Sequence, residues 1–260
     1  MQVNRELASH KLPRWTVSSF IAAFATAAQF SQMHLATTSE PALWIGERLH
    51  PFGQDVGSIV PPGFEAYARV FHPPYRVGAD RTVTPVRWRD IASANERSIQ
   101  AEMRRLDVSC QPAQFSHQQE RLWDQQPKTG RLPYEIAKRL VADLAAHTST
   151  PESCWFAVWD GFGDLAIPDH AGPKFAIPGR TCLLLHGDIA DVLHTLSSVD
   201  WIYLAPSLWW PEDRAWCVAT DIDFTWTYIG GTRECIREVL VDPELEALPT
   251  NPAEGNCMET

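Results

Sequence analysis

Residues 154–161, CWFAVWDG, and residues 181–187, TCLLLHG, decide the fold. Each is a short, almost continuous apolar run that ends in glycine, as expected for a central strand that is covered on both faces. Residues 215–226, AWCVATDIDFTW, alternate between the two faces of a further predicted strand. Residues 228–231 then predict a turn. One more strand, bracketed by prolines, is predicted within residues 61–75.

Helical patterns are interspersed with these strands. In residues 134–147, Tyr134, Ala137, Val141 and Leu144 fall on one stripe, which predicts an amphipathic helix. Shorter helices are predicted at residues 88–96, 188–196 and 232–241, the last with Thr232 as its N-cap. Since no regular strand–helix–strand repeat is present, the sequence predicts a single α+β domain with a mainly antiparallel sheet and helices packed on it.

The domain is predicted to occupy residues 41–248. Residues 107–133 are rich in Gln, Pro and charged residues and predict a long surface connection within the domain. Residues 1–40 are predicted to form an N-terminal extension that is helical or disordered. Residues 249–260 are predicted to form a flexible tail.

The N-terminal extension allows several interpretations. Residues 1–28 resemble a weak secretory signal, with a basic start and an apolar run over residues 15–28. There are two alternatives. The segment could form an amphipathic helix, or it could be a tail that precedes a true start at Met33 instead of Met1. The run is shorter than the roughly 20 residues that a membrane span requires, so no membrane association is predicted.

The six cysteines predict a cytoplasmic protein. No CxxC pair occurs, which argues against a zinc ribbon or a thioredoxin-like site. Cys154, Cys182 and Cys217 each lie inside an apolar run, where a reduced cysteine behaves as a small buried apolar residue. Six cysteines in an oxidising compartment would more often form disulfides.

Negative charge is concentrated toward the carboxyl end. The formal net charge is −10, and residues 200–260 hold twelve Asp and Glu residues against three arginines. Because nucleic-acid affinity depends largely on Lys and Arg that displace counterions, no nucleic-acid binding is predicted, and an anionic membrane surface is disfavoured for the same reason. A basic protein partner or a metal ion is compatible with this charge, whose simplest role is solubility.

The eleven tryptophans are the most unusual feature of the composition. Trp209 and Trp210 stand beside Pro211, Glu212 and Asp213 in a segment that predicts an exposed corner. Tryptophan is enriched at interface hot spots because it buries a large area and keeps a polar N–H. The sequence therefore predicts a binding site for a basic, partly apolar partner at Trp209, Trp210, Glu212 and Asp213. Packing into the core is the alternative for the two tryptophans.

Asp221 and Asp223 are the most suggestive carboxylates for chemistry. They lie two residues apart at a strand end and so point to the same side, where oxygen ligands of Mg²⁺, Mn²⁺ or Ca²⁺ would be suitable. Asp160, after the first central strand, is a third candidate ligand. The alternative is that these acids mark the exit of a strand into solvent or a tight turn.

Recognised catalytic motifs are missing from the sequence. There is no H-E-x-x-H, G-x-S-x-G, Walker A or G-x-G-x-x-G pattern. His72 and His186 stand at strand ends, where they could act as bases, although a hydrogen-bonded structural role is favoured for each.

Three blocks carry a resemblance to a known family: residues 53–74, residues 154–164 and residues 208–231. In these blocks the chain resembles a family of bacterial proteins described only as hypothetical. The resemblance covers residues 44–248 and implies a single domain. It implies no activity, cofactor or catalytic residue.

Two functional hypotheses follow. The first is a non-enzymatic protein-binding module, which engages a basic partner as an immunity protein neutralises a basic toxin. The second is a metal-assisted hydrolase or transferase that uses the Asp221/Asp223 pair. The first is preferred because of the acidic C-terminal quarter and the missing catalytic motifs.

Overall fold

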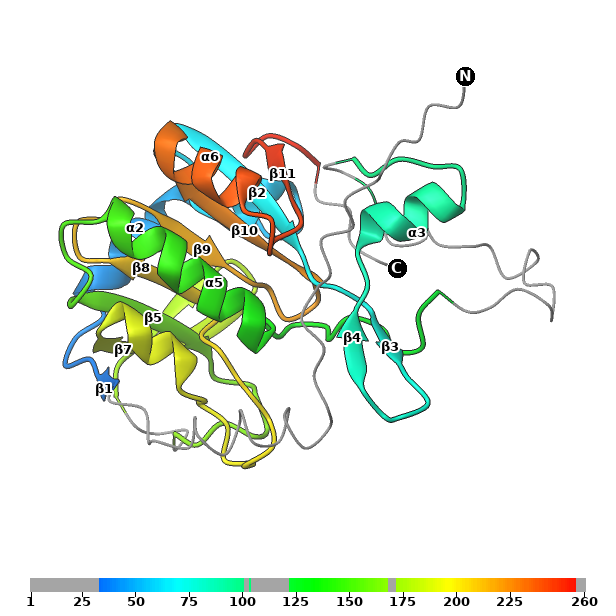
Figure 1. Ribbon diagram of the computed structural model, residues 1–260. Helices are drawn as coiled ribbons and strands as arrows, with labels where there is room; N and C mark the ends of the chain where they lie inside the picture. Colours follow the sequence, from blue (N-terminus) through cyan, green and yellow to red (C-terminus); the bar gives the residue numbers. More distant parts are fainter. Residues whose placement is uncertain (1–32, 101–102, 104–121, 168–171, 256–260) are drawn as a thin grey trace, which may run out of the picture.

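Nine strands form one antiparallel sheet at the centre of the molecule (Figure 1). The computed structural model describes residues 33–100, 103, 122–167 and 172–255. The order of the strands is β1-β7-β5-β8-β9-β10-β2-β11, and β6 also pairs with β7. Their bounds are β1 His34–Leu35, β2 Ala66–Phe71, β5 Cys154–Trp159, β6 Lys174–Ile177, β7 Arg180–Gly187, β8 Leu208–Pro211, β9 Cys217–Ala219, β10 Trp226–Gly231 and β11 Ala247–Thr250.

Both predicted central strands lie inside this sheet. Strand β5 pairs with β7 on one side and with β8 on the other, so that Cys154 lies opposite both Gly187 and Pro211. Side chains alternate between two buried layers: Phe156 belongs to one and Ala157 to the other. Burial on both faces explains the continuous apolar runs. The prediction of an α+β domain with a mainly antiparallel sheet is confirmed.

Two helices cover one face of the sheet, as Figure 1 shows. Helix α5 (Tyr134–Leu144) continues into the 3₁₀ turn η4 (Ala145–His147), and α6 (Arg233–Val241) packs against it and against β2 and β10. Each helix buries one apolar stripe. The predicted N-cap is confirmed, because the hydroxyl of Thr232 accepts a hydrogen bond from the backbone N–H of Cys235.

The other face is covered by the segment that follows β1. It contains the 3₁₀ turn η1 (Glu40–Ala42), helix α2 (Leu43–Arg48) and the 3₁₀ turn η2 (Val56–Ser58). Trp44 and Ile45 of α2 pack into the apolar layer beneath them.

A third, smaller apolar cluster lies beside the main body. It contains helix α3 (Trp88–Ala94), and the hairpin β3 (Tyr75–Val77) and β4 (Val83–Pro85) leads into it. Figure 1 shows α3 and this hairpin to the right of the large sheet. Glu246 connects the cluster to the domain by accepting hydrogen bonds from the backbone N–H groups of Trp88 and Arg89, at 2.7 and 2.8 Å.

Three local predictions are wrong. The predicted helix at residues 188–196 is a 3₁₀ helix, η5 (Ile189–Leu193), with Asp188 and Asp191 in a capping box. The predicted strand at residues 215–226 is interrupted after β9 by a turn in which the N–H of Phe224 donates to Asp221 O. The predicted turn at residues 228–231 lies inside strand β10, fully paired with β2.

The domain boundaries also differ from the prediction. The domain begins before residue 41, because Met33 is buried and β1 pairs with β7. Residues 249–255 are no flexible tail: Thr250 lies in β11, and the N–H groups of Val56 and Gly57 donate to Glu254 O and Pro252 O. Most of the predicted connection at residues 107–133, and residues 1–32 and 256–260, lie outside the described residues.

Candidate functional site

The prediction that Trp209 and Trp210 form an exposed corner is wrong. Both side chains are fully buried, at 0% exposure. They lie in β8, between β5 and β9. The ring of Trp209 meets Trp216 edge to face at 5.2 Å, and Trp210 meets Trp44 at 5.9 Å. A side chain that is buried in this way cannot contact a partner protein while the domain remains folded.

Glu212 and Asp213, the two acids predicted beside them, are exposed at the end of β8. Glu212 accepts a hydrogen bond from the indole N–H of Trp155. Asp213 accepts hydrogen bonds from the backbone N–H of Ser149 at 2.7 Å and from the hydroxyl of Thr148 at 2.9 Å. Both carboxylates are therefore held in place while remaining at the surface.

The sheet brings two further exposed acids to the same end. Cys154 is paired with both Gly187 and Pro211. The residues just beyond these three positions therefore lie together at one end of three adjacent strands. The exposed carboxylates that come from there are Glu152, Asp188, Glu212 and Asp213. We call these four residues the acidic end.

The acidic end retains its negative charge. None of its four carboxylates forms an ion pair with a lysine or arginine of the described chain. The guanidinium of Arg214, the adjacent residue, lies over the ring of Trp44 at 5.3 Å. Backbone and hydroxyl donors satisfy Asp188 and Asp213 instead, and these carry no formal charge.

Two pKa values reflect this environment. Burial, followed by the charges of Asp188, Asp213 and Glu152, raises the pKa of the Cys154 thiol to about 12. Burial alone would raise the pKa of Asp213, but hydrogen bonds from Ser149 and Thr148 outweigh it and hold the pKa below its ordinary value. Asp213 is therefore ionised over the whole neutral range.

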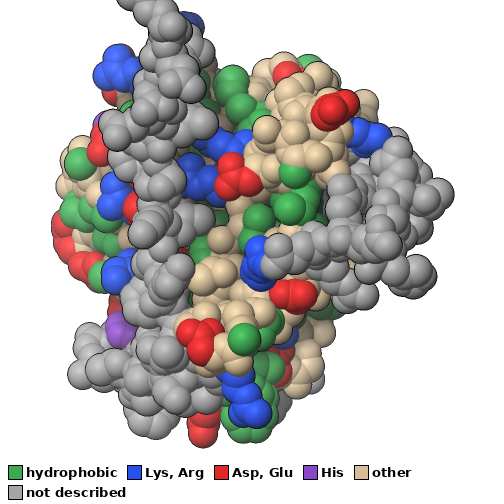
Figure 2. All heavy atoms as spheres, turned by 45° about the vertical axis from the view of Figure 1, so that its right-hand side comes forward, with side chains coloured by type: hydrophobic (Ala, Val, Ile, Leu, Met, Phe, Trp, Pro, Cys, Tyr) green, Lys and Arg blue, Asp and Glu red, His purple; other side chains and the backbone are tan. Residues whose placement is uncertain are grey.

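Some other acids of the C-terminal quarter are engaged by basic side chains. Arg139 pairs with Asp242, Arg89 with Glu246, and His147 with Glu238. On the face that Figure 2 brings forward, the coloured acidic and basic side chains are interspersed and form no continuous patch of one sign. Ion pairs thus compensate part of the negative charge of the C-terminal quarter.

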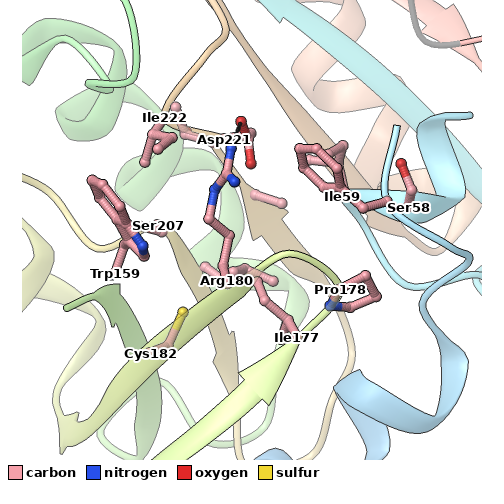
Figure 3. Close-up of a pocket in the computed structure, with 14 residues that line it drawn as sticks. Ser58, Ile59, Trp159, Ile177, Pro178, Arg180, Cys182, Ser207, Asp221 and Ile222 are labelled. Carbon is pink, nitrogen blue, oxygen red and sulfur yellow. Dashed lines mark hydrogen bonds and ion pairs between the residues drawn. The ribbon is translucent and has the colours of Figure 1, made fainter. Parts of the chain in front are cut away.

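Asp221, one of the predicted metal ligands, lines a small open cleft at the opposite end of the same strands. Figure 3 shows Arg180 in the middle of this cleft, between Trp159 and Ile59, with its guanidinium toward Asp221. Its Nη2 lies 3.4 Å from Asp221 Oδ1 and 2.6 Å from Asp223 Oδ2. The two carboxylates share one cation that belongs to the chain.

Asp160, the third predicted ligand, is engaged elsewhere by an ion pair of 2.9 Å with Lys174. In the part of the chain that the structure describes, no group of three or more His, Cys, Asp and Glu side chains could hold a metal ion. Burial raises the pKa of Asp221 above its ordinary value, although the hydrogen bond from the Asp223 backbone and the charge of Arg180 lower it. Asp160, Asp221 and Asp223 are therefore not brought together as a metal centre.

No known family model matches this chain. No curated protein and no solved structure matches it either. The resemblance to uncharacterised bacterial proteins stays a prediction. Among the described residues, every helix is too short or too polar to span a bilayer.

Both histidines singled out in the sequence make hydrogen bonds. The imidazole of His186 lies 3.0 Å from the hydroxyl of Ser153 and packs on the ring of Trp155 at 4.5 Å, directly beside the acidic end. His72 is fully buried, and its Nε2 lies 2.9 Å from the hydroxyl of Thr227. Burial lowers the pKa of His72 to about 3, against a smaller opposing effect of the Lys128 backbone.

Trp155 is a candidate binding residue that sequence reasoning missed. Its position in an apolar run predicts only packing into the core. In the structure it is half-buried, and its indole N–H reaches Glu212, 57 residues further along the chain. No local sequence pattern carries this information, because the contact depends on the pairing of β5 with β8.

Proposed function

We propose that this protein is a non-enzymatic protein-binding module whose acidic end receives a basic partner, as an immunity protein receives a basic toxin. The single observation that carries the proposal is the convergence of Glu152, Asp188, Glu212 and Asp213 at one end of three adjacent strands, without a lysine or arginine partner in the described chain. Because they lie at one end of the same strands, these four carboxylates can act together on an approaching cation.

Charge at such a surface acts mainly on association. Complementary potentials steer a basic partner toward the site and raise the association rate, and they suppress binding of acidic competitors. Trp155 supplies a large, half-buried ring beside Glu212. Aromatic residues of this kind often carry much of the energy at the centre of an interface.

The same charge disfavours phosphate backbones and anionic lipids, and we propose neither nucleic acid nor membrane as a partner. The four described cysteines, Cys154, Cys182, Cys217 and Cys235, are free and buried. Free thiols support the proposal of a cytoplasmic location.

The alternative, a metal-assisted hydrolase or transferase, has no comparable support. Its two principal carboxylates are both engaged by Arg180, and Asp160 is engaged by Lys174. A hard divalent cation generally requires several oxygen ligands in one place.

Binding of a short polylysine peptide, measured by calorimetry at low and at high salt, tests the proposal. The double variant Glu152→Lys/Glu212→Gln removes negative charge from the acidic end, and the glutamine can still accept the hydrogen bond from Trp155. We expect the affinity of the variant to fall by about tenfold or more at low salt, and the difference to shrink as salt screens the charges.

The matched control is Glu47→Lys/Glu234→Gln, which makes the same change in charge at two exposed positions on α2 and α6. The control should bind polylysine nearly as the unmodified protein does. Equal losses in both double variants would reduce the effect to net charge and refute a specific acidic end. A polyglutamate peptide should not bind to any of the three proteins.

A further inference from the structure

Two buried carboxylates meet one guanidinium where α5 contacts the end of α6. Asp143 of α5 is 5% exposed, and Asp242, the residue after α6, is 7% exposed. Arg139, one turn before Asp143, places its Nε 3.7 Å from Asp143 Oδ1 and in direct contact with Asp242 Oδ2. If both carboxylates were ionised, one negative charge would remain uncompensated at a buried position.

The hydrogen bonding of the pair indicates where the excess charge goes. Asp242 Oδ1 accepts a hydrogen bond of 2.7 Å from the N–H of Glu244, whereas Asp143 Oδ2 is buried and has no hydrogen-bond partner among the described residues. An ionised carboxylate can only accept hydrogen bonds, and a protonated one can donate. A proton on Asp143 would allow it to donate to Asp242 and would satisfy both groups.

We propose that Asp143 and Asp242 share one proton across the α5–α6 contact, and that loss of this proton as the pH rises loosens the hold of residues 148–149 on Asp213 in the acidic end. The shared proton stands on the geometry of the pair. The effect on the acidic end rests in addition on the function proposed above.

The surrounding charges favour the shared proton. Arg139 of α5 is the cation that faces the pair, whereas Glu238 of α6 and Glu244 of the next turn add acidic groups near it. The nearby thiol of Cys235 is neutral, because burial and the neighbouring acids raise its pKa to about 12. Glu238 is itself within 2.7 Å of His147 in η4. One guanidinium therefore stands against an excess of acidic groups, which opposes a second negative charge.

The direction of the pH effect follows from the carboxyl group. Burial, followed by the hydrogen bond that the protonated group donates to Asp242 and by the charge of Asp242, raises the pKa of Asp143 from its ordinary 3.8 to about 7. The folded state thus binds a proton that the unfolded state releases near pH 4. The stability that this proton contributes is fully present below about pH 4 and is lost as the pH rises to about 7.

A short continuous segment connects the pair to the acidic end. Helix α5 ends at Leu144, whose carbonyl accepts a hydrogen bond of 3.1 Å from the indole N–H of Trp216. The 3₁₀ turn η4 follows, and then Thr148 and Ser149, which donate to the carboxylate of Asp213. A displacement of the last turn of α5 would be transmitted over four residues to Asp213.

The first test is the titration of the Asp143 carboxyl carbon by NMR. We expect a midpoint near 7 in the unmodified protein. In Asp242→Asn the midpoint should be displaced toward 3.8, because the negative charge of Asp242 is removed. A midpoint near 4 in both proteins would overturn the proposal. Asp143→Asn, whose amide can donate to Asp242, should fold and should lose the decline in stability from about pH 4 to about pH 7.

The second test concerns the acidic end and compares polylysine binding to the unmodified protein and to Asp143→Asn. The ratio of affinities cancels every pH effect that the two proteins share. We expect equal affinities at pH 5.5 and a loss of about fivefold for the unmodified protein at pH 8.5. Asp200→Asn, an exposed change of the same type, should follow the unmodified protein at both values.

The two proposals fail in different ways. If polylysine binds to neither protein at any pH, the proposed function is refuted, and the NMR midpoint still decides whether the proton is shared. If binding occurs with a constant ratio between pH 5.5 and 8.5, the acidic end stands and its regulation by this proton is refuted.

Discussion

The rings of Trp209 and Trp216 meet edge to face, with 5.2 Å between their centroids and 78° between their planes. Both side chains are fully buried between the sheet and α5. The pair thus contributes to the folding of the domain and not to its outer surface.

Replacement of Trp209 by alanine should therefore reduce stability. We expect Trp209→Ala to lower the free energy of unfolding by about 3–5 kcal/mol, because it removes a large buried side chain and leaves a cavity. Denaturant titration followed by circular dichroism measures this. Trp201, which is 74% exposed, provides the control, and Trp201→Ala should change stability little. A fully stable Trp209→Ala protein would contradict the burial.

Removal of the cation from the cleft should also be costly. Arg180 is 15% exposed and Asp221 9% exposed at their side chains, so Arg180→Gln leaves a nearly buried carboxylate without its partner. We expect a loss of about 3 kcal/mol in the free energy of unfolding. In Arg180→Gln/Asp221→Asn the loss should be smaller than in Arg180→Gln alone. Additive losses would show that the two side chains do not interact.

Gly130 lies where no other residue fits. Its φ is +70°, its N–H donates to Phe224 O at 2.7 Å, and a Cβ would lie 2.2 Å from Ile222 O. We expect Gly130→Ala to destabilise the protein by about 2 kcal/mol or more, since the left-handed conformation alone costs about 1–2 kcal/mol. Gly163→Ala is the control, because nothing lies within 4 Å of its Cβ position. Thermal unfolding of the two variants should differ clearly.

The buried His72 should make stability depend on acid pH. Its folded pKa of about 3 lies below the ordinary 6.5, so the folded state binds fewer protons than the unfolded state. The stabilising contribution is present above pH 6.5 and is lost as the pH falls toward 3.

His72→Gln, which cannot titrate and can still bond to Thr227, should show a shallower decline of the free energy of unfolding over this range. The pH series should be recorded in denaturant for both proteins. If the free energies of unfolding of the two proteins changed in parallel from pH 7 to pH 4, the lowered pKa of His72 would be contradicted.

The elements that depend on local periodicity could be predicted. Local patterns are sufficient to predict these elements. Strands β5 and β7 are recognised from continuous apolar runs, and helix α5 is recognised from an apolar stripe with the helical repeat. Strand β10 was missed because Gly230 and Gly231 are typical of a turn. Gly230 is needed there for a different reason: a Cβ would lie 2.5 Å from the ring of Phe64, which packs against the strand.

The candidate site could be predicted only in part. Glu212 and Asp213 were found because they follow one another in the chain. Glu152 and Asp188 were not, because their proximity depends on the pairing of β5, β7 and β8, which join distant segments. Trp209 and Trp210 were misplaced, since Pro211 and the acids after it are typical of a surface corner.

Strand β11 closes one side of the sheet and carries Pro249, which faces Ala68 of β2. A proline has no N–H, so the outer margin of this strand cannot offer an unbroken row of donors to another chain. Such an interruption disfavours the edge-to-edge pairing with strands of other chains that leads to amyloid. Pro249 thus disfavours the addition of a strand from another chain at this edge of the sheet.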